Sequence, residues 1–259
     1  MYKFILTEIN ESVLSIKLNR PEVYNAFNEE MLLELQDAFK NASQDDSIRC
    51  ITITGEGKAF SSGQDLKDFT DKKSTFKEAL EKKYNPLINQ ITSIPKPVIC
   101  GINGVAAGAG LSIALACDYR IAVESATLIE VFINVGLVPD SGSSFFLPKI
   151  IGYARAFEMC TTADKIPAKT ALEWGLVNKV VSSQKIMTKL LSLTAKKYAS
   201  MPTKSIGMIK NILNISYNSD LNTILNLEGE YQNIAGNSND YKEGVNSFLE
   251  KRRPMFSGT

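Results

Sequence analysis

The segments AFSSGQDL (residues 59–66) and NGVAAGAG (residues 103–110) decide the fold class of this chain of 259 residues. Each follows an apolar run with the composition of a buried strand, at residues 48–54 and 98–102. Glycine lets a loop backbone approach a ligand closely, and the second segment leads into a helix whose first N–H groups favour an anion. The pair predicts a site built from main-chain groups, although tight packing of small residues explains either loop alone equally well.

The spacing of the glycines argues against the two common phosphate-binding loops. Residues 104–110 read G-x-x-x-G-x-G, which lacks the G-x-G-x-x-G order of a dinucleotide-binding loop. Gly57-Lys58 lacks both the following Ser or Thr and the spacing of a P-loop. No separate nucleotide cofactor is therefore expected.

Outward from these loops, strands interleave with helices over roughly two thirds of the chain, and helices alone follow. The pattern predicts strands at residues 3–8, 13–18, 48–54, 98–102, 119–123, 128–135 and 177–181. It predicts helices after an Asn28 cap, at about 74–91 and 109–117, from 141 to 161 with an interruption near Gly152, and at 183–200, 203–216, 221–235 and 240–251. We expect an α/β core over residues 1–200 and a helical region, for oligomerisation, over residues 201–259.

The chain has no histidine, which excludes several kinds of site. A Ser-His-Asp or Cys-His nucleophile, an H-E-x-x-H zinc site and a zinc finger all need that side chain. Proton transfer must therefore use Asp, Glu, Tyr, Cys, Lys or water. No metal site is expected.

Charge and hydropathy give no sign of a nucleic-acid or membrane partner. The formal net charge is +1, and no apolar run approaches the roughly 18–20 residues of a membrane span. The N-terminal apolar segment is too short, and charged residues interrupt it too early, for a signal peptide. The four cysteines form no C-x-x-C pair and lie in or beside apolar runs, which is typical of buried thiols in a reducing compartment. We expect a cytoplasmic protein.

A single acid stands out at Asp140, between Pro139 and a run of serine and glycine at residues 141–144. An aspartate there could simply cap the following helix. Its apolar neighbours support a second interpretation, in which desolvation raises the pKa of the carboxyl group and makes it a proton acceptor near neutrality.

At these places the sequence resembles the crotonase (enoyl-CoA hydratase/isomerase) superfamily over nearly its whole length. The matching segments are Leu18-Asn19-Arg20-Pro21, both glycine loops, Pro95-Lys96-Pro97, Cys117-Asp118, GLVPDSGSSFFLPKIIG (136–152) and Trp174-Gly175-Leu176-Val177. Within the superfamily the resemblance is strongest to ring 1,2-epoxyphenylacetyl-CoA isomerases of phenylacetate breakdown, and it extends to 3,2-trans-enoyl-CoA isomerases. It implies a spiral of ββα units with a C-terminal helical region, assembled as a homotrimer or a dimer of trimers.

The resemblance also implies roles for particular residues. The backbone N–H groups of Gln64 and Ala109 would form an oxyanion hole for the carbonyl of an acyl-CoA thioester, and Asp140 would move the proton. Coenzyme A would enter as part of the substrate. Contacts with the substrate are expected from Ala26, Ser62, Asp65, Leu66, Gly108 and Phe132. Lys58 could meet a phosphate, and Phe256 could reach a neighbouring subunit's ligand.

Two departures from the family pattern point to isomerisation instead of water addition. Family hydratases carry one glutamate in the helix after the second loop and another before the third motif, where this chain has Ser112 and Phe132. Hydration through Glu130 remains an alternative, because a strand over residues 128–135 would place it on the same face as Phe132. A non-catalytic acyl-CoA-binding protein is a further alternative. The phenylalanines that could line an aromatic-sized pocket or belong to the core are Phe69, Phe132, Phe145 and Phe146.

Overall fold

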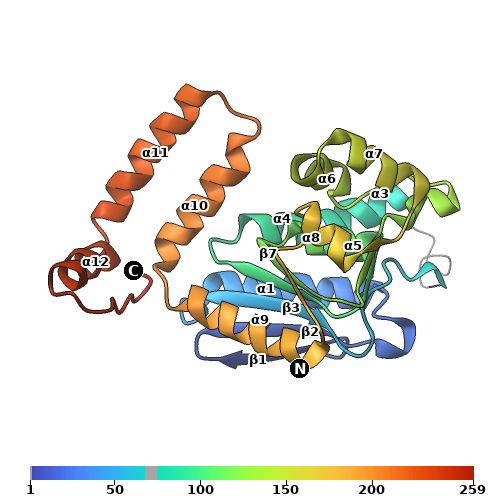
Figure 1. Ribbon diagram of the computed structural model, residues 1–259, viewed down its shortest axis with the longest axis horizontal. Coiled ribbons are helices and arrows are strands. Elements are labelled where there is room, and N and C mark those ends of the chain that lie inside the picture. Colours follow the sequence, from blue (N-terminus) through green and yellow to red (C-terminus); the bar gives the residue numbers. More distant parts are fainter. Residues whose placement is uncertain (1, 68–74) are drawn as a thin grey trace.

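The computed structural model describes residues 2–67 and 75–259, and its strands form two sheets (Figure 1). The larger sheet has the order β1-β2-β3-β5-β7-β10, and the smaller has the order β4-β6-β8-β9. The larger sheet contains β1 (Ile5–Asn10), β2 (Val13–Leu18), β3 (Cys50–Gly55), β5 (Val98–Ile102), β7 (Tyr119–Val123) and β10 (Lys179–Val181). The smaller contains β4 (Ala59–Ser61), β6 (Val105–Ala107), β8 (Thr127–Ile129) and β9 (Ile166–Pro167).

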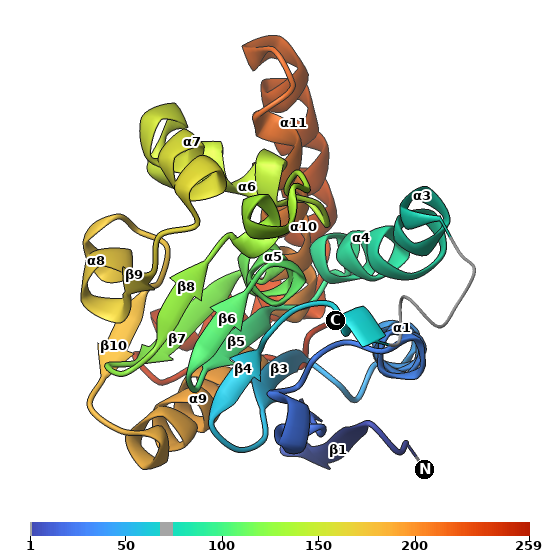
Figure 2. The ribbon, with the colours of Figure 1, turned by 90° about the vertical axis from the view of Figure 1, so that its right-hand side faces the viewer.

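From β3 to β8 the chain places consecutive strands alternately in the two sheets, which produces a spiral. The pairs β3 and β4, β5 and β6, and β7 and β8 each contribute one strand to each sheet. Neighbouring strands from successive turns are parallel, and Figure 2 shows β4, β6 and β8 side by side. This arrangement confirms the predicted spiral of ββα units with a C-terminal helical region. It also carries both glycine loops to the smaller sheet, where β4 pairs with β6.

Helices cover the sheets. Helix α1 (Glu29–Gln44) begins at the predicted cap, because Asn28 Oδ1 accepts from the backbone N–H of Met31 at 3.1 Å. A continuous helical run follows Thr75: α3 (Phe76–Ala79), the π-helical turn η2 (Leu80–Tyr84) and α4 (Asn85–Ser93). Helix α5 (Ala109–Ala116) is buried along its whole length, and α9 (Gln184–Ala199) packs on the larger sheet. The predicted start of the second helix at Ser74, and Phe69, lie outside the described residues.

The later helices agree closely with the expected boundaries. They are α6 (Ser143–Ile151), α7 (Tyr153–Thr162), α10 (Thr203–Ser216), α11 (Leu221–Gly236) and α12 (Asn239–Leu249). The sequence pattern did not predict the short helix α8 (Ala168–Glu173). Gly152 separates α6 from α7, as its interruption of the helical pattern predicts. Figure 1 shows α10 and α11 as a pair of helices that projects beside the sheets. No helix in the described part of the chain is both long enough and apolar enough to cross a membrane.

The strand predicted over residues 128–135 is wrong beyond its first two residues. The strand β8 ends at Ile129, where its pairing with β6 ends, and a 3₁₀ helix, η3 (Val131–Val135), follows. Apolar and β-branched residues dominate this segment, and short apolar runs of this kind do not distinguish a strand from a buried helical turn. The argument that Glu130 and Phe132 share one strand face therefore fails.

Candidate active site

A cavity of about 200 Å³ lies where the two glycine loops meet. Its walls come from the loop after β4, the start of α5, the helical run from α3 to η2, the 3₁₀ helix η3 and the turn before α6. The lining residues are Ser62, Gly63, Gln64, Leu66, Phe76, Ala79, Leu80, Tyr84, Gly108, Ala109, Val131, Phe132, Asn134, Val135, Leu137 and Asp140. Most of the wall is apolar, and its polar side chains are those of Ser62, Gln64, Tyr84, Asn134 and Asp140.

The two loops touch through glycine. Gly63 has a φ of +93°, and a Cβ atom there would lie 2.8 Å from the carbonyl oxygen of Ala107 and 3.5 Å from the backbone nitrogen of Ala109. Contact at 2.8 Å excludes any side chain, and positive φ is strained for residues other than glycine. The sequence therefore needs Gly63 for the backbones of residues 64 and 109 to meet.

The backbone N–H groups of Gln64 and Ala109 are available to a ligand. Phe27 donates to the carbonyl of Gly63 at 2.7 Å and accepts from the N–H of Asp65 at 2.9 Å, so in this parallel bridge the N–H of Gln64 points away from Phe27. Ala109 is the first residue of α5, where an N–H has no acceptor within the helix. Among the described residues, no backbone hydrogen bond outside helices and strands uses either N–H.

The side chain of Gln64 is fixed by three hydrogen bonds. Its amide nitrogen donates to the carbonyls of Phe27 and Asp65, each at 3.2 Å, and its amide oxygen accepts from the hydroxyl of Tyr84. Tyr84 is buried and packs edge-on against Phe27, with ring centroids 6.4 Å apart. Sequence reasoning missed this function of Tyr84. The signal that could have drawn attention to it is structural, since π-helical turns such as Leu80–Tyr84 occur frequently at functional sites.

Asp140 lies in the cavity wall with its carboxyl group partly buried. Burial raises the pKa of this carboxyl group, and the hydroxyl of Ser141, which donates to Oδ1 at 2.8 Å, opposes the rise. The alternative that Asp140 caps the next helix is wrong. Helix α6 begins at Ser143, its cap residue is Gly142, and no side chain caps it.

The positions to which the family resemblance assigns the two hydratase glutamates carry no acid. Ser112 is fully buried, and its hydroxyl lies within hydrogen-bonding distance of the carbonyl oxygens of Gly108 (3.2 Å) and Asp140 (3.1 Å) and of the hydroxyl of Ser143 (2.8 Å). Phe132 lines the cavity beside Gly108, where an added Cβ would lie 3.6 Å from the ring. The remaining candidate acid, Glu130, is not among the lining residues.

The residues expected to contact substrate fall into two groups. Ser62, Leu66, Gly108 and Phe132 line the cavity together with Gln64, Ala109 and Asp140. Ala26 and Asp65 do not.

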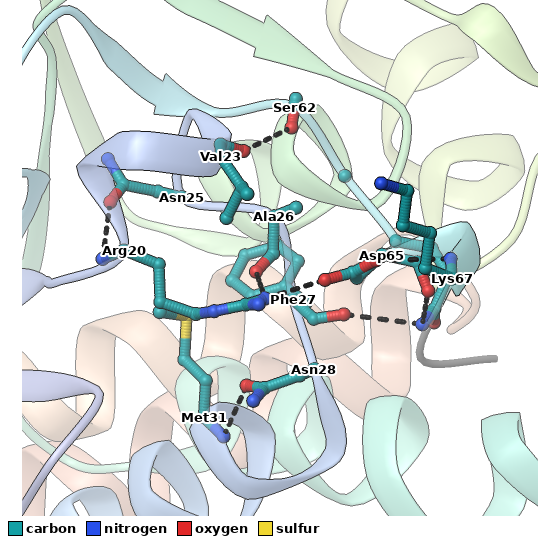
Figure 3. Close-up of polar contacts among 12 residues, drawn as sticks. Arg20, Val23, Asn25, Ala26, Phe27, Asn28, Met31, Ser62, Asp65 and Lys67 are labelled. Atoms are coloured by element: carbon teal, nitrogen blue, oxygen red, sulfur yellow. Dashed lines mark hydrogen bonds and ion pairs between the residues drawn. The ribbon is translucent and has the colours of Figure 1, made fainter. Parts of the chain in front are cut away.

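Both of these outlying residues contact Arg20, whose guanidinium donates to the carbonyl of Ala26 at 2.7 Å and to the carboxylate of Asp65 at 2.9 Å (Figure 3). The Asp65 carboxylate also accepts from the backbone N–H of Lys67 at 3.1 Å, so it helps to hold the loop. Any contact of Ala26 or Asp65 with coenzyme A stays a prediction.

The phenylalanines that the sequence offered as pocket or core residues lie in different places. Phe145 and Phe146 line a different cavity of about 510 Å³ between α4, α6 and α10, while Phe132 lines the site. Lys58 is exposed, and Phe256 lies in a hollow among the C-terminal helices. Neither position tests the roles expected for these two residues.

Comparison with known proteins assigns the chain to a family. The family model described as enoyl-CoA hydratase/isomerase matches residues 8–259. The 1,2-epoxyphenylacetyl-CoA isomerase of Escherichia coli (strain K12) is 41% identical over the full length of both chains. The trans-2-decenoyl-[acyl-carrier-protein] isomerase of Streptococcus mutans is 34% identical over 99% of each chain. A crystal structure of a putative enoyl-CoA hydratase/isomerase from Mycobacterium abscessus superposes with a TM-score of 0.93 at 34% identity, over 98% of this chain and all of that one. The chain therefore belongs to the enoyl-CoA hydratase/isomerase family and has the crotonase fold.

Proposed function

We propose that this enzyme isomerises an acyl-CoA thioester, with Asp140 as the only acid-base residue and the N–H groups of Gln64 and Ala109 as the oxyanion hole. One observation carries the proposal: a carboxyl group of raised pKa shares a cavity with two available backbone donors, while Ser112 and Phe132 occupy the positions of the hydratase acids.

The proposed reaction begins when the Asp140 carboxylate takes a proton from the carbon beside the thioester carbonyl. The resulting enolate oxygen accepts hydrogen bonds from Gln64 and Ala109, which stabilise the charge that develops there. With a 3-enoyl thioester, Asp140 then returns the proton two carbons along, so that the double bond moves and the composition of the substrate does not change. With an epoxide-bearing aryl-acetyl thioester, the same enolate would lead to opening and expansion of the ring, again without change of composition. One carboxyl group suffices for both steps because it is protonated by the first and deprotonated by the second.

The aromatic and aliphatic wall of the cavity supports an acyl group of the aryl-acetyl type. Phe76, Tyr84 and Phe132 contribute rings, and about 200 Å³ would hold a six-membered ring. By similarity to its E. coli relative, we propose 1,2-epoxyphenylacetyl-CoA, in phenylacetate degradation, as the first candidate substrate. A 3-enoyl thioester is the second candidate, favoured by the relative from S. mutans.

Hydration of 2-enoyl-CoA has less support. It needs an acid to position water and an acid to deliver a proton. Glu130, the substitute considered from the sequence, does not line the cavity and is hydrogen-bonded to Ser143.

Incubation with 3-enoyl-CoA and 2-enoyl-CoA in heavy water, followed by mass spectrometry, tests the proposal. We expect the double bond to migrate with deuterium uptake and without gain of water, and 1,2-epoxyphenylacetyl-CoA to give a product of unchanged composition. Rapid gain of water by 2-enoyl-CoA would contradict the proposed isomerase function.

A further inference from the structure

Glu130 is a buried carboxyl group that the proposed reaction does not use. It lies between β8 and η3 and is 0% exposed. Its Oε1 lies 2.8 Å from the hydroxyl of Ser143, while its Oε2 is buried without a hydrogen-bond partner. No ion pair among the described residues includes Glu130. An ionised carboxylate without a cation and with one oxygen unpartnered is costly to bury, and a neutral acid in the same place costs much less.

A chain of hydroxyl groups connects Glu130 to the active site. Ser143 lies 2.8 Å from both Glu130 and Ser112, measured between side-chain oxygens, and all three residues are fully buried. Ser112 in turn lies 3.1 Å from the carbonyl oxygen of Asp140 and 3.2 Å from that of Gly108. Those two carbonyls belong to the proposed base and to the residue before the oxyanion-hole donor Ala109.

The number of protons that Glu130, Ser143 and Ser112 can donate shows what Glu130 controls. Each serine hydroxyl has one proton to donate. If Glu130 is ionised, Ser143 must donate to it, and the Ser112 proton is shared between Ser143 and the two carbonyls. If Glu130 is neutral, it can donate to Ser143, and Ser143 can donate to Ser112. The proton of Ser112 is then left entirely for the carbonyls of Asp140 and Gly108.

We propose that Glu130 is a positioning residue, a neutral carboxylic acid that directs the hydroxyls of Ser143 and Ser112 onto the main chain of the active site. The inference rests on the proposed function for its kinetic consequences only. Burial raises the pKa of Glu130 to about 8, the hydrogen bond from Ser143 opposes the rise, and the charge of Asp140 adds to it. The acid therefore stays protonated at neutral pH.

Ionisation of Glu130 at higher pH should lower kcat for two reasons. It withdraws the proton of Ser143 from the chain, and it adds a negative charge close to Asp140, where an enolate must form. Two titratable groups are electrostatically linked to Glu130: Asp140 in the turn before α6, and Cys160 on α7. Burial raises the pKa of Cys160 to about 11, so this thiol does not ionise near pH 8.

Kinetics of variants at Glu130 and Ser143 test the positioning role. Glu130→Leu and Ser143→Ala each break the chain, and each should lower kcat by about 10- to 100-fold with KM little changed, because the site is present but misplaced. The double variant should be no worse than either single one, because both changes remove the same chain of hydrogen bonds.

Glu130→Gln should rescue the kcat lost in Glu130→Leu, because its amide can donate to Ser143. This variant should also lack the fall of kcat above about pH 8. Cys160→Ala is the control and should keep that fall. Additive losses in the double variant, or a fall at high pH that persists in Glu130→Gln, would overturn the proposal.

Infrared difference spectroscopy tests the proton on Glu130 without any substrate. The wild-type protein minus Glu130→Gln should show the carbonyl band of a protonated carboxylic acid at pH 7, which disappears as the pH passes about 8. Absence of that band at pH 7 would refute the neutral acid. If the band is present and the wild-type protein does not isomerise acyl-CoA esters, the failure lies in the proposed function and not in the state of Glu130.

Discussion

The carboxyl group of Asp140 combines access to the cavity with partial burial, and burial favours its neutral form. A carboxylate of raised pKa is a stronger base once ionised, so this environment suits removal of a proton from carbon near neutral pH. The same raised pKa means that activity should be lost, as pH falls, at a higher pH than for a solvated aspartate.

Replacement of Asp140 by asparagine should reduce kcat by at least about 100-fold, because the amide cannot accept the proton. The affinity for an unreactive acyl-CoA should remain nearly unchanged, because size and polarity are conserved. Turnover measured by mass spectrometry and binding measured by calorimetry give the two quantities. Asp164→Asn, at an exposed position, is the matched control. An active Asp140→Asn variant would remove the proposed base.

Glu130 also has a consequence for stability. Its pKa is about 8 in the folded protein against an ordinary value of 4.5, so between these values the folded state binds more protons than the unfolded state. The stability that this proton contributes is complete below the unfolded pKa and is lost as pH rises through the folded pKa. Glu130→Gln does not titrate. Its free energy of unfolding, relative to wild type, should therefore rise by about 3 kcal/mol between pH 5 and pH 8. Urea unfolding of both proteins at several pH values measures the difference in their free energies of unfolding. A difference that does not change with pH would contradict the raised pKa of Glu130.

Single residues also mark what the sequence could and could not predict of the site. The family resemblance implies Gln64, Ala109 and Asp140, and the features that carry it, two glycine loops and an acid among apolar residues, are visible in short segments. The hydroxyl chain is not visible in this way, because Ser112 and Ser143 are 31 positions apart and meet only after α5 and α6 pack. The hydrogen bond between Tyr84 and Gln64 is hidden for the same reason.

At the scale of elements, the beginning of α5 supplies a donor that a side-chain replacement leaves in place. Proline removes the N–H and is tolerated at the first position of a helix. The preceding residue, Gly108, has a φ of 50° and a ψ of −125°, which a glycine without Cβ can keep before proline. Ala109→Pro should therefore lower kcat by about 100- to 1000-fold, the usual cost of losing one oxyanion-hole donor.

A second proline variant controls for the effect of proline itself. Gln184 is the first residue of α9 and follows Ser183, which is extended as a residue before proline should be. Gln184→Pro should keep kcat near the wild-type value. Circular dichroism checks that both variants fold, and equal kcat values for Ala109→Pro and wild type would refute the role of this N–H.

The elements that sequence patterns predicted best are those bounded by a cap residue, a glycine or a proline. The Asn28 cap, the break at Gly152 and the start of α10 after Pro202 all appear at the expected residues. The first strand begins two residues later than expected, since its pairing with β2 extends only from Ile5 to Asn10. The strand predicted over residues 128–135 failed because pairing with a neighbouring strand, and not local composition, decides where β8 ends.

At the scale of the molecule, the C-terminal helices expose large apolar side chains. Leu221, Phe248 and Leu249 are each more than 70% exposed, and a hollow of about 680 Å³ lies between α10, α11, α12 and the chain end. Phe248 and Leu249 line this hollow, and an apolar patch on the surface marks an interaction site in soluble proteins. The homotrimer, or dimer of trimers, that the family resemblance implies would cover it.

Analytical ultracentrifugation tests the predicted assembly. The wild-type protein should sediment as a trimer or hexamer at micromolar concentration, and Phe248→Glu should shift it toward monomer by placing a charge in the interface. Ile9→Glu changes an exposed apolar residue of β1 in the same way and should leave the assembly intact. A wild-type protein that sediments as a monomer would contradict the prediction.

The meeting of the two loops through Gly63 has a consequence for how such a protein can change over generations. Because main-chain groups of Gln64 and Ala109 supply the proposed donors, nearly every amino-acid replacement at these positions leaves the donors in place. Mutation is then free to explore the cavity wall and the acids around it, at positions such as Phe132 and Asp140, without removing the means of holding an enolate. One inherited backbone can in this way serve lineages with different substrates and different proton chemistry.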